Sequence, residues 1–180
     1  MARKHGPWTI EETDEKHRDA FITVRVDRVI QPDGKPGRYS TVAMKPGAAV
    51  LPIGNDGNVF LTKQFRYALG RESVEVACGG VDEGETPLEA ARREALEELG
   101  VEATDWHDLG HFDLDTSIVN CRVDLFVARG LRLVSARREG TETIESLEVP
   151  LDEAIRMVMD GRITHGPSCV LILKASRSPA

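Results

Sequence analysis

Three glutamates near the middle of the chain have the spacing of a cation site. Glu94, Glu97 and Glu98 stand at i, i+3 and i+4, so on a helix their carboxylates would share one patch of surface. Like charges at this spacing repel, and acids in the last turn face the negative end of the helix dipole. Arg93 offsets only part of this charge, which favours a bound cation. Clustered carboxylate oxygens suit Mg²⁺ or Mn²⁺ rather than zinc. For three glutamates alone, a solvated acidic face is the alternative.

The negative charge of the protein is concentrated around these glutamates. The chain has 180 residues, with 23 Lys and Arg against 30 Asp and Glu, a net charge of −7. Residues 75–98 hold eight acids and two bases, a net −6, so the rest has 22 acids against 21 bases. Because the chain as a whole has no basic surplus, we expect no binding to a nucleic-acid backbone.

A helix over residues 87–99 would present the glutamates. Thr86 is a good N-cap, Pro87 suits the first helical position, and Glu89 completes a capping box with Thr86. Gly100 is suited to end the helix. Leu88, Ala91, Ala95 and Leu99 fall on one face, which we expect to pack on a sheet.

Other elements are predicted from hydrophobic alternation and turn signals. Asn55-Asp56-Gly57 favours a hairpin between its flanking strands, because these residues tolerate positive φ. Strands before and after helices give an α+β fold, an α/β/α sandwich with a mixed sheet. The predicted strands are 22–26, 38–44, 48–53, 58–66, 73–77 and 123–128, and two further helices are predicted at 151–159 and 168–175.

The spacing of residues 79–101 resembles the signature of the Nudix hydrolase family. The matching positions are Gly79, Glu85, Arg93, Glu94, Glu97, Glu98, Gly100 and Val101, while Ala95 stands where the family prefers a larger aliphatic residue. The resemblance implies a Nudix fold over most of the chain, with additional N-terminal antiparallel strands. We expect residues 1–46 to form an N-terminal strand region that serves as a dimerisation element, and residues 47–180 to form the Nudix hydrolase domain.

The resemblance also implies roles for the matching residues. Glu94, Glu97 and Glu98 would bind Mg²⁺, with Mn²⁺ as an alternative, together with the backbone carbonyl of Cys78. Arg93 and Glu85 would orient this cluster through ion pairs, and Glu97 would also take part in catalysis. Because only its carbonyl is needed, Cys78 can fill a place where the family usually has alanine; no activating histidine marks its thiol as a nucleophile.

Residues outside the signature resemble the ADP-ribose and ADP-sugar pyrophosphatase branch. There, residues at the places of Arg66 and Glu75 contact the substrate; the alternative for Arg66 is a structural salt bridge to Glu75. The general base would be Glu142, with Glu139 as its rival. Residues 115–122 stand at the place of a substrate-recognition loop but depart from the branch's usual sequence.

The resemblance therefore predicts metal-dependent hydrolysis of a nucleotide sugar, most directly of ADP-ribose to AMP and ribose 5-phosphate. Another nucleotide sugar, such as GDP-mannose, and a non-catalytic nucleotide sensor are the alternatives. We expect a homodimer. The three cysteines form no CxxC pair and apolar runs are short, so we expect a cytoplasmic protein without a membrane segment. The five histidines show no metal-binding spacing, and we expect them to be surface or core residues.

Overall fold

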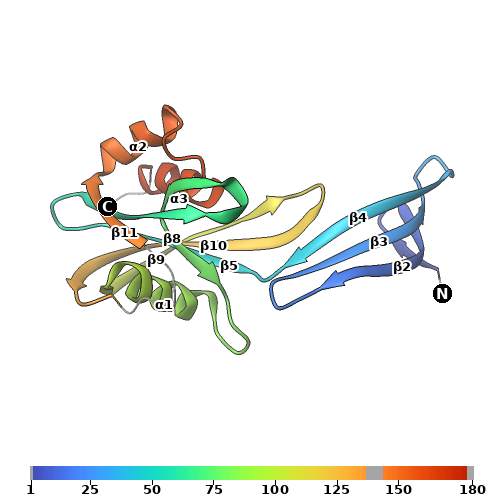
Figure 1. The fold of residues 1–180 in the computed structure, drawn as a ribbon, viewed down its shortest axis with the longest axis horizontal. Coiled ribbons are helices and arrows are strands. Elements are labelled where there is room, and N and C mark those ends of the chain that lie inside the picture. The colour runs from blue at the N-terminus through green and yellow to red at the C-terminus, as the bar shows by residue number, and fades with distance from the viewer. Residues whose placement is uncertain (1, 137–143, 178–180) are drawn as a thin grey trace. The chain divides into compact units, whose positions relative to one another are not determined.

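The computed structural model describes residues 2–136 and 144–177. Two compact units are distinguished, residues 1–45 with 113–121 and residues 46–112 with 122–180. Figure 1 labels most of their helices and strands.

The first unit holds four strands that each pair antiparallel with the next along the chain, and residues 119–120 pair parallel to the last of them. Its strands are β1 (Arg3–His5), β2 (Trp8–Arg18), β3 (Ile22–Ile30) and β4 (Pro36–Met44). A turn joins β3 to β4, in which the Gly34 N–H donates to the Gln31 carbonyl at 2.9 Å. Ile10 and Val29 are the buried apolar residues of this sheet. Most other side chains on β2 are exposed, so this unit has little core of its own.

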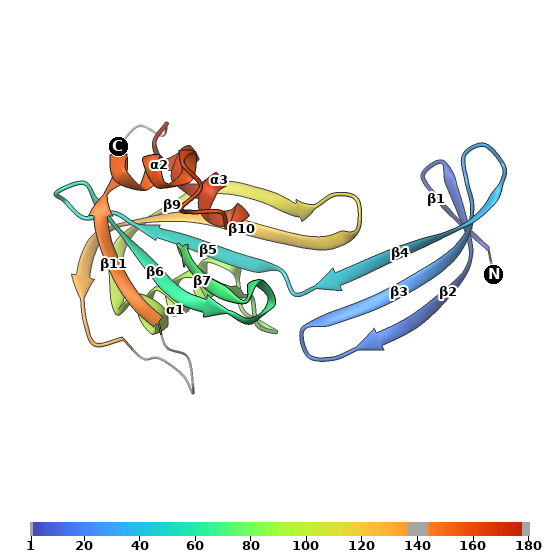
Figure 2. The same cartoon turned by 45° about the horizontal axis from the view of Figure 1, so that its top comes forward.

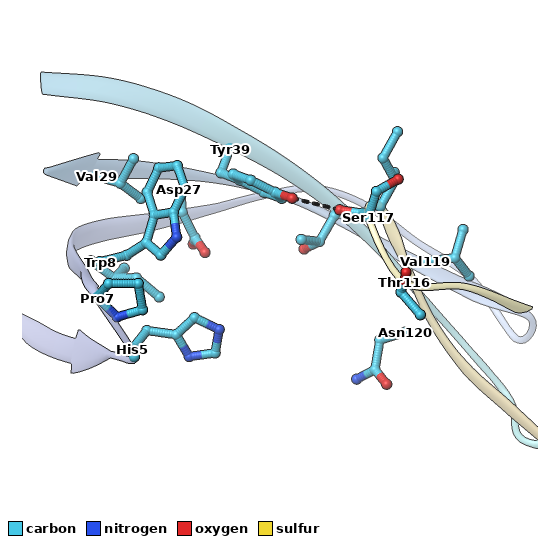
Figure 3. Close-up of a pocket in the computed structure, with 14 residues that line it drawn as sticks. His5, Pro7, Trp8, Asp27, Val29, Tyr39, Thr116, Ser117, Val119 and Asn120 are labelled. Carbon is cyan, nitrogen blue, oxygen red and sulfur yellow. Dashed lines mark hydrogen bonds between the residues drawn. The ribbon is translucent and has the colours of Figure 1, made fainter. Parts of the chain in front are cut away.

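A cavity of about 440 Å³ lies in this first unit (Figure 3). Trp8 packs edge-on against Tyr39, with ring centroids 5.5 Å apart, and Tyr39 Oη donates to the Ser117 carbonyl at 2.6 Å. Residues 116–118 are the tip of a hairpin: β9 ends at Asp115 and β10 begins at Val119, so the rest of the segment 115–122 is strand. The Asp115 carboxylate accepts from the backbone N–H of Ser117, which fixes the tip.

The described residues of the second unit form strands of two sheets, three α-helices and one short 3-10 helix. In one sheet β5 pairs parallel to β10 and antiparallel to β8, and β9 pairs with β10; the other sheet is β11-β6-β7. Because parallel and antiparallel pairs occur together, the sheet is mixed. The elements are β5 (Gly47–Pro52), β6 (Asn58–Arg66), η1 (Tyr67–Leu69), β7 (Arg71–Glu75), β8 (Ala77–Gly80), α1 (Pro87–Leu99), β9 (Val101–Asp115), β10 (Val119–Leu133), β11 (Ile144–Pro150), α2 (Leu151–Met159) and α3 (Gly166–Ala175).

Strand β5 is the centre of this second unit, and all six of its residues are buried. Helix α1 covers one face, where Ala91 and Ala95 pack with Ala48 and Val50. Helix α3 contacts the same strand, and Figure 2 shows α1 and α3 on opposite sides of it. Small side chains at the α1 contact let the helix approach the sheet closely. The predicted α+β class, with its α/β/α sandwich and N-terminal antiparallel strands, is confirmed.

The hairpin predicted around residues 55–57 is wrong, although its turn is present. The turn forms, with Gly57 at φ 81° and its N–H donating to the Gly54 carbonyl. However, β5 and β6 belong to different sheets and share only one isolated bridge, between Ile53 and Val59. Both edges of β5 are taken by distant strands, β10 and β8, which a local turn signal does not reveal.

The strand predicted at 73–77 is two strands in different sheets. Strand β7 ends at Glu75 and β8 begins at Ala77, so the chain changes sheet at Val76. The buried Val76 N–H leaves the ladder and donates to Ser168 Oγ at 2.9 Å. The switch places Glu75 at the end of β7 and Cys78 within β8.

No helix among the described residues has both the length and the apolarity needed to cross a bilayer.

Candidate active site

Helix α1 begins and ends as the sequence predicts. The Glu89 N–H donates to Thr86 Oγ1, and the Thr86 N–H donates to the Glu89 carboxylate at 2.8 Å, which completes the capping box. Gly100 ends the helix at φ 64°. A Cβ at Gly100 would lie 2.3 Å from the Val134 carbonyl oxygen, so both the backbone conformation and the lack of space require glycine there.

Arg93, in the middle of α1, forms ion pairs with several carboxylates of the acidic cluster. Its Nη1 lies 2.6 Å from Glu94 Oε1 and 3.1 Å from Glu97 Oε2. Its Nε lies 3.0 Å from Glu85 Oε1, and its Nη2 donates to the Gly80 carbonyl at 2.8 Å. One positive charge thus faces three carboxylates, so two negative charges remain without compensation from this arginine. The ion pairs that we expected of Arg93 and Glu85 in this cluster are present.

Glu94 and Glu98 are buried, at 9% and 7% exposure, although both are acids. The Cys78 N–H donates to Glu98 Oε2 at 3.2 Å. Burial first, and then the nearby charge of Glu94, raise the pKa of Glu98 to about 8. Burial and the charge of Glu98 raise the pKa of the Cys78 thiol to about 12, which keeps it protonated at neutral pH.

Gly79 on β8 makes room for Glu94. A Cβ at this position would lie 1.9 Å from Glu94 Oε1, well inside van der Waals contact. Any side chain here would displace the carboxylate. The glycine of the signature therefore has a steric reason: it lets the strand backbone and an α1 carboxylate meet.

The cluster suits a hard divalent cation by its donor chemistry. Within residues 2–136 and 144–177, no three His, Cys, Asp or Glu side chains are arranged as a formed metal site. Arg93 instead holds the carboxylates of Glu94 and Glu97. Nevertheless, two buried acids that repel each other are costly without a cation, and their oxygens match the ligand preference of Mg²⁺. The residues present therefore fit such an ion.

A second group of charges centres on Glu75, which is 2% exposed. Arg66 donates to it twice, from Nε to Oε1 at 3.0 Å and from Nη2 to Oε2 at 2.6 Å. Burial opposes ionisation of Glu75, but the bonds from Arg66 hold its pKa below the ordinary value. Arg66 and Glu98 also influence each other's pKa, so the two groups of charges adjoin. The salt bridge that we considered as an alternative role for Arg66 is present.

His165 belongs to this group, although its sequence context predicts only a surface or core residue. Its Nδ1 lies 3.3 Å from Glu75 Oε2 and 2.8 Å from Ser168 Oγ. Burial lowers the pKa of His165, which keeps the imidazole neutral at neutral pH. No sequence signal marks this contact, because 90 residues separate the two partners.

The two candidate general bases, Glu142 and Glu139, lie outside the described residues. Their roles stay predictions.

Two family models match the chain. The NUDIX domain model matches residues 43–167, and the model described as nucleoside diphosphate sugar hydrolase N-terminal domain matches residues 8–42. The first match covers more than half of the chain and contains the whole acidic cluster.

Known proteins resemble the chain over most of its length. An ADP-ribose pyrophosphatase of Bacillus subtilis is 32% identical over 76% of this chain and 75% of its own, and a GDP-mannose pyrophosphatase of Pectobacterium atrosepticum is 37% identical over 72% of each. A crystal structure described as an ADP compounds hydrolase has the same fold, with a TM-score of 0.82 at 21% identity over 97% of this chain and 95% of that one. The chain therefore belongs to the Nudix hydrolase family and carries the N-terminal domain of nucleoside diphosphate sugar hydrolases.

Proposed function

We propose that this protein hydrolyses ADP-ribose in a metal-dependent reaction, giving AMP and ribose 5-phosphate. Water adds across the diphosphate, one P–O bond of the bridge breaks, and each product keeps one phosphate. The observation that supports this most is the burial of Glu94 and Glu98 beside Gly79, because two repelling acids at a glycine-lined surface suit a cation that in turn attracts a diphosphate.

The metal would be held by Glu94, Glu97 and Glu98 with the carbonyl of Cys78. When bound, Mg²⁺, or Mn²⁺ in its place, neutralises phosphate charge and lowers the pKa of a bound water. Arg93 and Glu85 hold the carboxylates in place, as their contacts suggest. Since the bridging arginine already pairs with Glu97, metal binding would require the Arg93–Glu97 contact to adjust.

Arg66 would bind the substrate diphosphate, and Glu75 would orient it. The guanidinium uses Nε and Nη2 for Glu75, which leaves the Nη1 donors for a phosphate oxygen. The Arg66 side chain is 35% exposed, whereas Glu75 is almost fully buried. This difference is expected if Glu75 holds the arginine from inside the protein while the exposed side of the guanidinium binds a ligand. Glu142 is our proposed general base, with Glu139 as the rival.

A second candidate substrate is GDP-mannose, favoured by the 37% identity to a GDP-mannose pyrophosphatase. A nucleotide sensor without activity is disfavoured, because the carboxylates that such a protein would not need are all retained. We further propose a cytoplasmic homodimer, with residues 1–46 as the dimerisation element; sedimentation of the full chain against a chain lacking residues 1–46 tests this.

The test is a product analysis by chromatography. ADP-ribose, GDP-mannose, UDP-glucose, diadenosine polyphosphates and nucleoside triphosphates are each incubated with enzyme and Mg²⁺ or Mn²⁺. We expect AMP and ribose 5-phosphate from ADP-ribose at the highest kcat/KM, and no turnover with a chelator. Turnover of no compound, or full activity of Glu98→Gln, would refute the catalytic function. Faster turnover of GDP-mannose would move the assignment to the second candidate.

The base assignment needs separate variants. Glu142→Gln should reduce kcat by about 100-fold or more, as expected for loss of a general base, while Glu139→Gln should leave most activity. The reverse order would assign Glu139, and equal small losses would remove both.

A further inference from the structure

The side chain of Gln64 is buried beside the acidic cluster. Gln64 lies on β6, the middle strand of its sheet, opposite Ser73 on β7 and Ile144 on β11. Side chains two residues apart on a strand share a face, so Gln64 and Arg66 lie on the same face of β6. Helix α1, which carries Glu98, contacts this strand. Against the rise that burial causes, the charge of Arg66 and the amide of Gln64 both lower the pKa of Glu98, so both groups lie near its carboxylate.

The amide nitrogen of Gln64 is a buried donor without a partner. Gln64 is 7% exposed, and its Nε2 alone, among the fully buried side-chain nitrogens and oxygens of the described residues, makes no hydrogen bond. An amide N–H that is taken out of water and left unpaired is costly, and native proteins rarely tolerate it. The orphaned donor therefore indicates that the amide makes its hydrogen bond in another state of the site.

The carboxylate of Glu98 is the acceptor that fits this donor. The Cys78 N–H donates to Glu98 Oε2 at 3.2 Å, at the long end of the range for such a bond. A carboxylate accepts at about four positions on its two oxygens, so Glu98 has room for a second donor as well as for a cation. Hydrogen bonds from outside the metal shell fix the direction of a metal-binding carboxylate, and loss of one typically lowers metal affinity about 10- to 100-fold.

We propose that Gln64 is a positioning residue for the metal ligand Glu98: its Nε2–H donates to the Glu98 carboxylate when the cation is bound and fixes the direction of that carboxylate. The inference rests on the proposed function, in which Glu98 binds Mg²⁺. Gln64 touches neither the metal nor the substrate in this scheme. Its loss should therefore weaken metal binding in the absence of any substrate.

The binding test measures the Kd of Mn²⁺ without substrate, from the electron paramagnetic resonance signal of the free ion. Gln64→Met keeps an unbranched side chain of similar length but removes the donor, so we expect Kd to rise about tenfold. Adding Gln64→Met to Glu98→Gln should weaken binding no further, because both changes act on one interaction.

Thr62→Val is the matched control on the same strand. Thr62 is buried on the same face of β6, but its hydroxyl donates to the Glu75 carbonyl. Loss of this buried polar group should leave the Kd of Mn²⁺ within about twofold of wild type, because the bond is not to a metal-binding carboxylate. A tenfold rise in Thr62→Val as well would assign the effect to loosening of the strand and would overturn the proposal.

The outcomes separate the inference from the proposed function. If the wild type binds no Mn²⁺, the proposed metal site fails and the inference fails with it. If the wild type binds Mn²⁺ and Gln64→Met binds it equally well, only the inference fails. An unchanged Kd together with a raised KM for the substrate would assign the amide to the substrate and would also overturn the inference.

A measurement on the wild-type protein covers the case in which Gln64→Met does not fold. The chain has two glutamines, Gln31 and Gln64, so nitrogen labelling of glutamine side chains gives two amide signals in NMR. We expect Mg²⁺ to move one Gln64 amide proton to lower field and to slow its exchange with water, as a new bond to a carboxylate would. The Gln31 amide, which donates to the Pro36 carbonyl, is the internal control and should not change. A Gln64 signal that saturating Mg²⁺ leaves unchanged would overturn the proposal.

Discussion

Removing the buried charge at Glu98 should change how the stability of the metal-free protein depends on pH. The unfolded chain has a pKa near 4.5 at this residue, and the fold raises it to about 8, by burial first and then by the charge of Glu94. Between these values the folded state binds a proton that the unfolded state has released. Stability must therefore fall as pH rises through this window.

The magnitude follows from the linkage relation. One extra bound proton costs about 1.4 kcal/mol of unfolding free energy per pH unit. From pH 5 to pH 8 the wild type should lose at most about 4 kcal/mol through Glu98. Glu98→Gln keeps the size of the side chain and has no proton to lose, so its stability should fall less over the same range.

The assay is urea unfolding at pH 5, 6, 7 and 8 in the presence of a chelator. We expect Glu98→Gln to be the more stable protein at pH 8 and to differ little at pH 5. Glu83→Gln, at an exposed acid before α1, controls for removal of one negative charge and should keep the wild-type trend. Parallel curves for wild type and Glu98→Gln would refute the assignment of a buried, repelled carboxylate.

Binding of a metal ion should offset the loss of stability that ionised Glu98 causes at high pH. A cation that binds the folded state only stabilises it by mass action, so Mg²⁺ at pH 8 should raise the unfolding midpoint of the wild type and not that of Glu98→Gln. An equal rise in both proteins would place the ion elsewhere.

Three further substitutions test the packing of the site. Gly79→Ala should displace the Glu94 carboxylate and lower kcat/KM by about 10- to 100-fold with the fold intact. The control is Gly166→Ala, where an added Cβ meets nothing, and its kcat/KM should stay at the wild-type value. Equal kcat/KM values for the two variants would contradict the steric argument. Gly100→Ala should reduce the unfolding free energy by about 1–3 kcal/mol or more, measured by urea, because the left-handed backbone and the nearby backbone of Val134 and Ala136 exclude a side chain. Unchanged stability would exclude this strain. Arg93→Lys should raise the Mg²⁺ concentration for half-maximal activity about tenfold, since a lysine cannot bridge several carboxylates in the way that the guanidinium does. An unchanged Mg²⁺ titration would show that the bridging guanidinium is not needed.

Local elements were predicted well because their signals are local. The capping box, the proline at the first position and the terminal glycine are all within or next to α1, and the helix occupies the predicted residues. The hairpin failed because the partners of β5 are β8 and β10, strands far along the chain. A turn signal fixes where the chain bends but not which strands then pair.

The sequence alone determined the chemistry at the centre of the protein: an acidic helix whose carboxylates share a face, with the glycines that bound it. That follows from the helical repeat, which brings i, i+3 and i+4 together wherever the helix lies. Tertiary structure decided which of those acids are buried, that Gly79 meets Glu94, and that His165 meets Glu75. These contacts join residues on different elements, and only the packing of helix on sheet sets their distances.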